Sequence, residues 1–374
     1  MLIGIDASRA TASAPTGTET YSRELIRALL RLDRDNRYRL YMRAEALRDF
    51  FGASSNFEIR AMPFPRLWTH LRLSFEMLTR APDVLWVPAH VLPLIHPRRT
   101  IVTVHDLGQM HFPKAHPLAQ RLYHDWSTRW NVRAASHILA DSEATRDDLV
   151  RFCRIAPEKI SVVYPAYDAQ LYRPVRDAAR IAETHARLRI GKDYILAIGT
   201  IHPRKNYTRL IEAFGRLGIG PFGSTQGEDL RLVIVGKRGW LYDSIFARVQ
   251  ELNLQSRISF LDYVPAVDMP ALLNGARLLA FPSLHEGFGL PVLEAHACGT
   301  PVVCSLTSSL PEAAGDAALF VDPLDVDAIA GAMQRLLTDG ALREKLIARG
   351  FDNLKRFSWE ASARRVLDVI KGIA

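Results

Sequence analysis

Two successive series of short apolar runs, each alternating with amphipathic stretches, constrain the fold of this chain most strongly. Apolar runs separated by helical patterns predict βαβ units and a parallel sheet. In the first series, apolar residues from Tyr21 to Leu32 recur at helical spacing, so a helix over 18–32 should lay one face on the sheet. The strands expected in this series are 2–6, 38–42, 84–87, 101–104, 137–140 and 161–163.

A polar, charge-rich segment that contains Pro165 and Pro174 separates this series from the second one. The strands expected after it are 194–198, 230–235, 258–261, 278–281, 302–304 and 318–321. A chain of 374 residues exceeds what one hydrophobic core usually supports, so two doubly wound α/β domains are expected. Their predicted bounds are 1–168 and 193–357, with a linker over 169–192, a surface loop over 218–229, and a last helix over 358–374 that can pack back on the N-terminal domain.

The composition narrows the classes of function. Lys and Arg number 48 against 40 Asp and Glu, and the formal net charge of +8 favours an anionic partner. A nucleotide sugar, an anionic lipid surface and a nucleic acid all fit this charge, but no zinc-finger, RNP-type or helix-turn-helix signature supports the last. The N-terminus lacks a signal-peptide pattern and no apolar run reaches the roughly 20 residues of a membrane span, so a cytoplasmic protein is expected.

The stretch SLHEGFGLPVLEAHA, residues 283–297, is the most informative part of the sequence. Pro291 suits the first turn of a helix, so the preceding GFGL is expected to be a loop at a helix N-terminus. Such a terminus favours a diphosphate, and Glu286 and Glu294 lie about one helical turn from it. Their carboxylates can accept hydrogen bonds from sugar or ribose hydroxyls, although a solvated pair of Glu residues beside a tight turn explains the spacing equally well.

A second group, GTIHPRKN over 199–206, follows the strand expected at 194–198. Open α/β sheets bind ligands at the carboxyl ends of their strands, so its cations should lie at that edge. Arg204 and Lys205 can neutralise the charge that builds on a departing diphosphate. The alternative is a loop at a helix start with solvated basic side chains.

In the N-terminal half, the strand IVTV leads to His105 at the same kind of edge. A neutral imidazole there can donate to a sugar hydroxyl or to a developing oxyanion, while the alternative is a turn histidine that caps the strand with Asp106. The loop that follows the first strand ends in Gly17, which lets the backbone approach phosphates or an acceptor. Helix capping by Thr16 or Thr18 is the competing explanation for that loop.

The string Asp325-Val326-Asp327 imitates a metal-binding DxD motif, but it follows a proline and opens a helix, where Asp is favoured as a cap. No essential metal ion is therefore expected. Two stretches, 66–80 and 121–133, combine aromatic and basic residues and suit an anionic membrane surface. Trp68, Leu71, Phe75 and Leu78 share one helical face, however, and such a face is more often core.

The Glu-x7-Glu pattern around GFGLPVLE resembles the signature of the retaining glycosyltransferase family 4, which has the GT-B fold of two Rossmann-like domains facing each other across a cleft. Its bacterial O-antigen mannosyltransferase branch looks most similar. Six further ordered segments extend the resemblance over nearly the whole chain: GTETYSREL, VHDL, ADSEATRDDL, GTIHPRKN, SSLPEAAGDAALFVDP and FSWE.

The resemblance implies that Glu294 binds the donor ribose, that Glu286 contacts the transferred sugar, and that His105 lines the reaction centre. Thr200 occupies the place of the usual Arg, which leaves Arg204 as a substitute beside the matching Lys205. The candidate catalytic residues are therefore His105, Glu286, Arg204 and Lys205. The candidate donor-binding residues are Gly17, Gly199, Thr200, Arg204, Lys205, Glu286, Gly287, Phe288, Gly289, Leu290 and Glu294.

The implied activity is retaining, metal-independent and cofactor-independent transfer of a hexose, with GDP-mannose as the leading donor and a growing lipid-linked or polysaccharide glycan as the acceptor. The expected partners are thus a nucleotide sugar, a saccharide acceptor and the inner membrane face, and no nucleic acid. dTDP-rhamnose, UDP-glucose and UDP-N-acetylglucosamine stay open as donors. A nucleotide-sugar epimerase of the same architecture is the alternative enzyme. A dinucleotide oxidoreductase is disfavoured because neither half has GxGxxG after its first strand.

Overall fold

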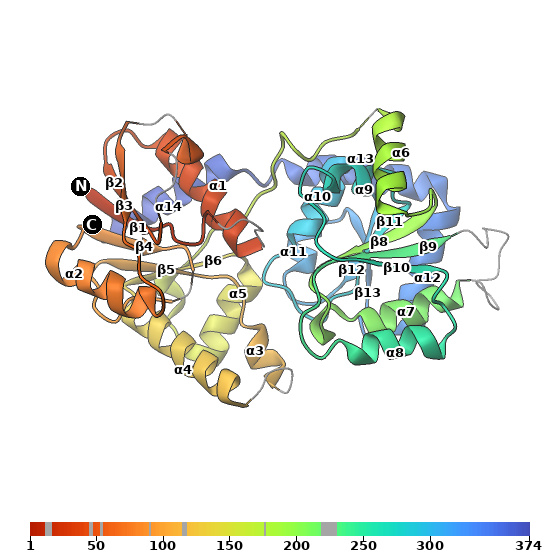
Figure 1. Ribbon diagram of the computed structural model, residues 1–374, viewed down its shortest axis with the longest axis horizontal. Coiled ribbons are helices and arrows are strands. Elements are labelled where there is room, and N and C mark those ends of the chain that lie inside the picture. Colours follow the sequence, from red (N-terminus) through yellow and green to blue (C-terminus); the bar gives the residue numbers. More distant parts are fainter. Residues whose placement is uncertain are drawn as a thin grey trace. The chain divides into compact units, whose positions relative to one another are not determined.

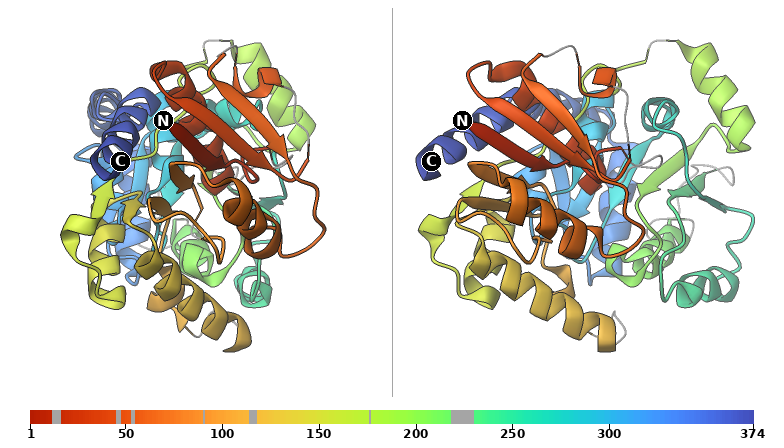
Figure 2. Two further views of the ribbon diagram at one scale, coloured as in Figure 1. Left: turned by 90° about the vertical axis from the view of Figure 1, so that its left-hand side faces the viewer. Right: turned by 60° about the vertical axis from the view of Figure 1, so that its left-hand side comes forward.

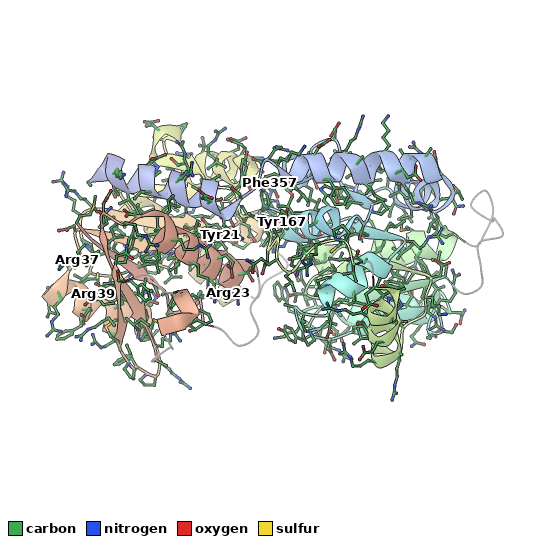
Figure 3. All side chains as sticks on the ribbon, turned by 90° about the horizontal axis from the view of Figure 1, so that it is seen from above. Tyr21, Arg23, Arg37, Arg39, Tyr167 and Phe357 are labelled. Atoms are coloured by element: carbon green, nitrogen blue, oxygen red, sulfur yellow. The ribbon has the colours of Figure 1, made fainter. Side chains whose placement is uncertain are left out.

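The computed structural model describes residues 1–11, 17–44, 48–52, 55–89, 91–113, 118–175, 177–217 and 230–374. The chain forms two compact units (Figure 1). The first unit contains Met1–Ala166 and Phe357–Ala374, and the second contains Tyr167–Arg356. Figure 3 labels Tyr167 and Phe357, the residues at which the chain passes from one unit to the other. The loop expected over 218–229 lies outside the described residues.

The first unit is built on a seven-stranded sheet in the order β3-β2-β1-β4-β5-β6-β7, and every neighbouring pair is parallel. Its strands are β1 (Leu2–Asp6), β2 (Arg37–Met42), β3 (Phe57–Ala61), β4 (Val84–Val87), β5 (Thr100–Val104), β6 (His137–Ala140) and β7 (Ile160–Val162). The parallel sheet and six of these strands confirm the expectation. Strand β3 was missed because Glu58 and Arg60 interrupt its apolar pattern, which an edge strand tolerates.

Helices cover both faces of the first sheet (Figures 1 and 2). Helices α1 (Gly17–Leu32) and α14 (Trp359–Ile373) pack against each other, and their apolar residues share one buried cluster with β1 and β2. A separate buried cluster contains apolar residues of β4, β5 and β6 together with residues of the helical elements that are given next. The remaining helical elements of this unit are η1 (Arg48–Phe51), η2 (Trp68–Leu73), α2 (Ser74–Arg80), α3 (Gly108–His111), α4 (Leu118–Ala134), α5 (Glu143–Asp148), η4 (Leu149–Cys153) and η5 (Pro157–Lys159).

The apolar face predicted over Trp68, Leu71, Phe75 and Leu78 is not core. Trp68 is buried, but the other three side chains are exposed, so the interpretation was wrong for them. The helical segment begins with the π-helical turn η2, and its core contacts come from Leu73 and Met77 instead. A π-turn has more residues per turn than an α-helix, so the regular helical spacing of the sequence did not identify the buried face.

The second unit contains a six-stranded parallel sheet in the order β10-β9-β8-β11-β12-β13. This order turns back between β8 and β11, which is the switch point where doubly wound sheets bind ligands. All six strands confirm the expectation, with ends that differ by a residue at most. They are β8 (Tyr194–Ile198), β9 (Arg231–Val235), β10 (Ile258–Leu261), β11 (Leu278–Phe281), β12 (Val302–Ser305) and β13 (Ala318–Val321).

The segment 169–192, expected to link the domains, contains helix α6 in the second unit. This helix packs on α9, and Asn274 at the end of α9 accepts a hydrogen bond from the amide of Val175 at 2.7 Å. The helical elements of the second unit are α6 (Ala178–Leu188), η6 (Pro203–Lys205), α7 (Tyr207–Arg216), α8 (Asp243–Glu251), α9 (Met269–Gly275), α10 (Leu290–Cys298), α11 (Leu310–Ala314), α12 (Val326–Thr338) and α13 (Gly340–Leu354). Among the described residues, no helix is both long and apolar enough to cross a bilayer.

Candidate functional site

The two motif loops of the second unit leave adjacent strands at the switch point. Strands β8 and β11 are paired, and the segments that follow them contain Gly199–Lys205 and Glu286–Leu290. A backbone hydrogen bond of 2.9 Å from the amide of Leu284 to the carbonyl of Arg204 joins the two loops directly. The structure therefore brings the two motifs, which lie about eighty residues apart in the sequence, into one place.

Gly199 is required by the conformation of the first loop. Its φ of +141° is one that side-chain-bearing residues rarely adopt, and an added Cβ would lie 2.8 Å from Cε of Lys205. The hydroxyl of Tyr207 donates to the Gly199 carbonyl at 2.8 Å and holds the turn. The loop can thus pass close to Lys205, while Thr200 and Arg204 lie partly exposed along it.

Lys205 and Glu286 form an ion pair at the centre of this region, with 2.6 Å between Nζ and Oε1. The side chain of Lys205 is 13% exposed and that of Glu286 is 11% exposed. Nζ of Lys205 also lies 4.9 Å from the centre of the Phe281 ring. Burial alone would raise the pKa of Glu286, but the charges of Lys205 and Arg204 lower it below its usual range. Glu286 is therefore held as a carboxylate with a cation beside it.

Two serines shape the backbone between Glu286 and Leu290. The hydroxyl of Ser308 accepts from the amide of Glu286 at 3.0 Å, and the hydroxyl of Ser309 lies 2.9 Å from the carbonyl oxygens of both Glu286 and Phe288. Gly289 then caps helix α10 with φ +110°, and a Cβ there would lie 2.7 Å from Leu310. The expected loop at a helix N-terminus is confirmed, with Pro291 in the first turn.

Glu294, one turn into α10, has an unexpected partner. Tyr172, from the segment predicted to be a linker, makes a side-chain hydrogen bond with it. Burial raises the pKa of Glu294 to about 7, although the Tyr172 bond lowers it. Glu294 thus changes charge near neutral pH. Sequence reasoning missed Tyr172 because a contact across more than a hundred residues has no local pattern.

A second aromatic group was also missed beside the Gly199 loop. The ring of Trp240 stacks on the buried ring of His202, with centroids 4.6 Å apart and an angle of 6° between the planes. A Cβ on Gly239 would lie 2.9 Å from Cγ2 of Thr200, which shows how closely the segment after β9 approaches the loop. Trp240 therefore adds an exposed aromatic surface at the same edge of the sheet.

His105, in the first unit, follows β5 and has acceptors at both ring nitrogens. Nδ1 lies 2.7 Å from Oδ2 of Asp141, and Nε2 lies 2.8 Å from the carbonyl oxygen of Pro88. The ring can donate through Nε2 to the Pro88 carbonyl, while Nδ1 and Asp141 share one hydrogen. Burial would lower the pKa of His105, but Asp141 and the Pro88 carbonyl raise it above its usual value. Both ring nitrogens therefore contact the protein itself, and the role expected for His105 in the reaction stays a prediction.

The surroundings of His105 leave one acceptor unused. Oδ1 of Asp141 is buried and has no hydrogen-bond partner among the residues that the structure describes. The ring of Tyr21 on α1 (Figure 3) stands edge-on to the His105 ring, with centroids 5.0 Å apart. A buried carboxylate oxygen usually has a donor, so a water or a ligand hydroxyl is expected there. Asp106 instead accepts from the amide of Gly108 at 2.9 Å and shapes the local turn.

The remaining predicted residues are placed as follows. Gly17 is the exposed first residue of α1. Thr16, together with the rest of 12–16, lies outside the described residues. Asp325 is the N-cap of α12 and accepts from the amide of Ala328 at 2.9 Å, which confirms the predicted cap.

Comparisons with known proteins match the two halves of the chain to two family profiles. The profile described as Glycosyltransferase Family 4 matches residues 15–171, and the profile described as Glycosyl transferases group 1 matches residues 181–352. The chain is 35% identical over 273 residues to O-antigen chain mannosyltransferase B of Escherichia coli, covering 73% of this chain and 70% of that protein. It is 28% identical over 281 residues to D-inositol 3-phosphate glycosyltransferase of Corynebacterium glutamicum, covering 74% of this chain and 65% of that protein.

Solved structures show the same two-unit architecture. Sucrose-phosphate synthase from Thermosynechococcus elongatus aligns with a TM-score of 0.78 at 21% identity, covering 100% of this chain and 98% of that one. WaaG, a glycosyltransferase involved in lipopolysaccharide biosynthesis, aligns with a TM-score of 0.73 at 16% identity over the whole of both chains. At these identities the likeness shows the fold alone, which is GT-B.

Proposed function

Because this chain belongs to the group 1 glycosyltransferases of family 4, we propose that it transfers mannose from GDP-mannose to a growing lipid-linked or polysaccharide glycan. That the protein is a glycosyltransferase of GT-B fold follows from the family. Mannose is proposed as the sugar because the chain is similar to an O-antigen chain mannosyltransferase. A relative named for D-inositol 3-phosphate keeps other nucleotide sugars as alternatives.

The observation that carries the proposal is the mostly buried Lys205–Glu286 pair at the switch point, beside the N-terminus of α10. Cations and a helix N-terminus favour the binding of a nucleotide diphosphate, and carboxylates accept hydrogen bonds from the hydroxyls of a sugar. These groups converge here. We propose that Glu294 binds the ribose, that Glu286 contacts the transferred sugar, and that Gly199, Thr200 and the backbone from Gly287 to Leu290 line the donor site.

The proposed chemistry follows from charge. Bond cleavage between the sugar and the diphosphate leaves negative charge on the leaving phosphate, and Lys205 with Arg204 would stabilise it without a metal ion or cofactor. We propose retention of configuration, as in the family that the sequence resembles. His105 would line the reaction centre, and Gly17 would contact donor or acceptor at the start of α1. We also propose that the protein acts at the cytoplasmic face of the inner membrane.

Thermal stabilisation by donors tests the proposal. A ligand that binds only the folded protein raises the unfolding midpoint, so GDP-mannose at millimolar concentration with EDTA present should raise it by a few degrees. The effect should vanish in Glu294→Ala and persist in Glu344→Ala, which changes an exposed glutamate on α13. UDP-glucose, UDP-N-acetylglucosamine and dTDP-rhamnose form the comparison set.

A rise with one of those donors instead would reassign the sugar, and the absence of a rise with every donor would overturn the nucleotide-sugar site. Incubation of the stabilising donor without acceptor separates transfer from epimerisation. An isomerised nucleotide sugar in that reaction would favour the epimerase, whereas a transferase leaves the donor sugar unchanged until an acceptor is added.

A further inference from the structure

Large apolar side chains of the first unit are exposed at the start of η2 and along η2 and α2, and on the loop that follows β4. The exposed fractions are 62% for Leu67, 50% for Leu71, 59% for Phe75, 66% for Leu78, 51% for Leu94 and 46% for Ile95. We call these six residues the α2 face. Single exposed apolar residues are ordinary, but a cluster of them on neighbouring segments marks an interaction surface.

The two segments of the α2 face are attached to each other. The amide of Ile95 donates to the hydroxyl of Ser74, the first residue of α2, at 3.3 Å. On the opposite side of the helix, Leu73 and Met77 are buried in the core of the first unit. The orientation of α2 is therefore set by its core contacts, and Leu71, Phe75 and Leu78 point away from that core. Figure 2 shows α2 on the outside of the first sheet.

Cations belong to the same two segments as the α2 face. Arg66, Arg80, Arg98 and Arg99 are exposed, and the guanidinium of Arg72 lies 6.0 Å from the centre of the Phe75 ring. Glu76 is the single carboxylate in the sequence of 62–81 and 91–99. It is buried and accepts from Arg60 at 3.1 Å and from Arg72 at 3.3 Å. The surface thus combines apolar side chains with an excess of positive charge.

We propose that the α2 face docks the protein on an anionic lipid bilayer. The apolar side chains would enter the interface between head groups and acyl chains, and the arginines would contact lipid phosphates. A second copy of the chain fits this surface less well, since pairing would bring the two sets of arginines together. Docking on a bilayer is separate from the glycosyl transfer reaction. The α2 face would bring an enzyme with a lipid-linked acceptor to the membrane that holds this acceptor.

Vesicle flotation tests the docking without donor or acceptor, so its result is independent of the proposed sugar transfer. The full chain should float with vesicles of phosphatidylglycerol and phosphatidylethanolamine and bind phosphatidylcholine vesicles much more weakly. Leu71→Ser/Phe75→Ser should lower the partition coefficient roughly tenfold for each side chain removed. The matched control is Val267→Ser/Leu324→Ser, which removes two exposed apolar side chains of the second unit and should bind like the wild type.

Substitution of arginines tests the electrostatic contribution to vesicle binding. Arg98→Gln/Arg99→Gln should weaken binding to anionic vesicles, and about 1 M NaCl, where the Debye length is about 3 Å, should abolish this difference. Arg349→Gln/Arg364→Gln removes the same charge elsewhere and should have little effect. Unchanged thermal midpoints would show that the variants fold. The proposal is overturned if the wild type does not float, if the two serine pairs behave alike, or if light scattering shows a dimer that Leu71→Ser/Phe75→Ser dissociates.

Discussion

At the residue scale, the candidate donor site is defined by charged groups whose environments differ. Glu286 is paired with Lys205 and stays ionised, whereas Glu294 is bonded to a neutral tyrosine and titrates near neutral pH. The two glutamates of one motif are therefore distinct in charge as well as in position. In the first unit, His105 is a third distinct group, because Asp141 and the Pro88 carbonyl raise its pKa above the usual value although burial lowers it.

Removal of one member of the Lys205–Glu286 pair should cost more than removal of both. Lys205→Met leaves Glu286 as a mostly buried charge without its cation, and a loss of roughly 2 to 3 kcal/mol in unfolding free energy is expected. Lys205→Met/Glu286→Gln should recover part of that loss. Urea denaturation of the wild type, both single variants and the double variant gives the coupling energy. A coupling near zero would contradict the ion pair.

Donor affinity should depend on pH through Glu294. Its pKa of about 7 means that the carboxylate that accepts from ribose hydroxyls forms as the pH rises through neutrality. Calorimetric titration of the stabilising donor from about pH 5.5 to about pH 8.5 should therefore show affinity increasing with pH. Glu294→Gln should bind weakly with a flat profile. Tyr172→Phe should shift the rise to higher pH, because the Tyr172 bond lowers the pKa of Glu294.

His105 should titrate above its ordinary range. A histidine whose pKa is raised by folding stabilises the protein most below its unfolded pKa, and this contribution is lost as the pH rises through the folded pKa. Asp141→Asn removes the main source of the raised pKa and should remove this pH dependence. Imidazole proton NMR signals followed through a pH titration measure both effects. A His105 signal that titrates below about 6.5 in the wild type would refute the raised pKa.

At the element scale, the local conformation of α10 depends on a glycine that the motif contains. Gly289→Ala places a Cβ at a φ of +110° and 2.7 Å from Leu310, so a loss of about 1 to 3 kcal/mol in unfolding free energy is expected. Gly372→Ala is the matched control, since its Cβ meets nothing within 4 Å, and it should be neutral or slightly stabilising. Equal effects of the two substitutions in urea denaturation would contradict the strained cap.

At the scale of the whole molecule, the C-terminal helix completes the first unit. Val366 and Ile370 of α14 are fully buried in the cluster that contains α1, although they follow the entire second unit in the sequence. Ile370→Ala should cost about 3 kcal/mol and lower the unfolding temperature of the first unit. Asp368→Ala is the control on the same helix. Scanning calorimetry with and without donor distinguishes the two units, because donor binding should raise the unfolding temperature of the second unit.

The sequence by itself determined the two parallel sheets, because the periodicity of strands and helices is a local property of the chain. It also indicated the loop before α10, since Gly289 and Pro291 encode that geometry in neighbouring residues. Only the tertiary structure decided that Tyr172 contacts Glu294, that Asp141 and Pro88 hold His105, and that Phe75 faces outward. Those outcomes depend on which distant segments pack together, and no spacing within one segment of the sequence encodes that choice.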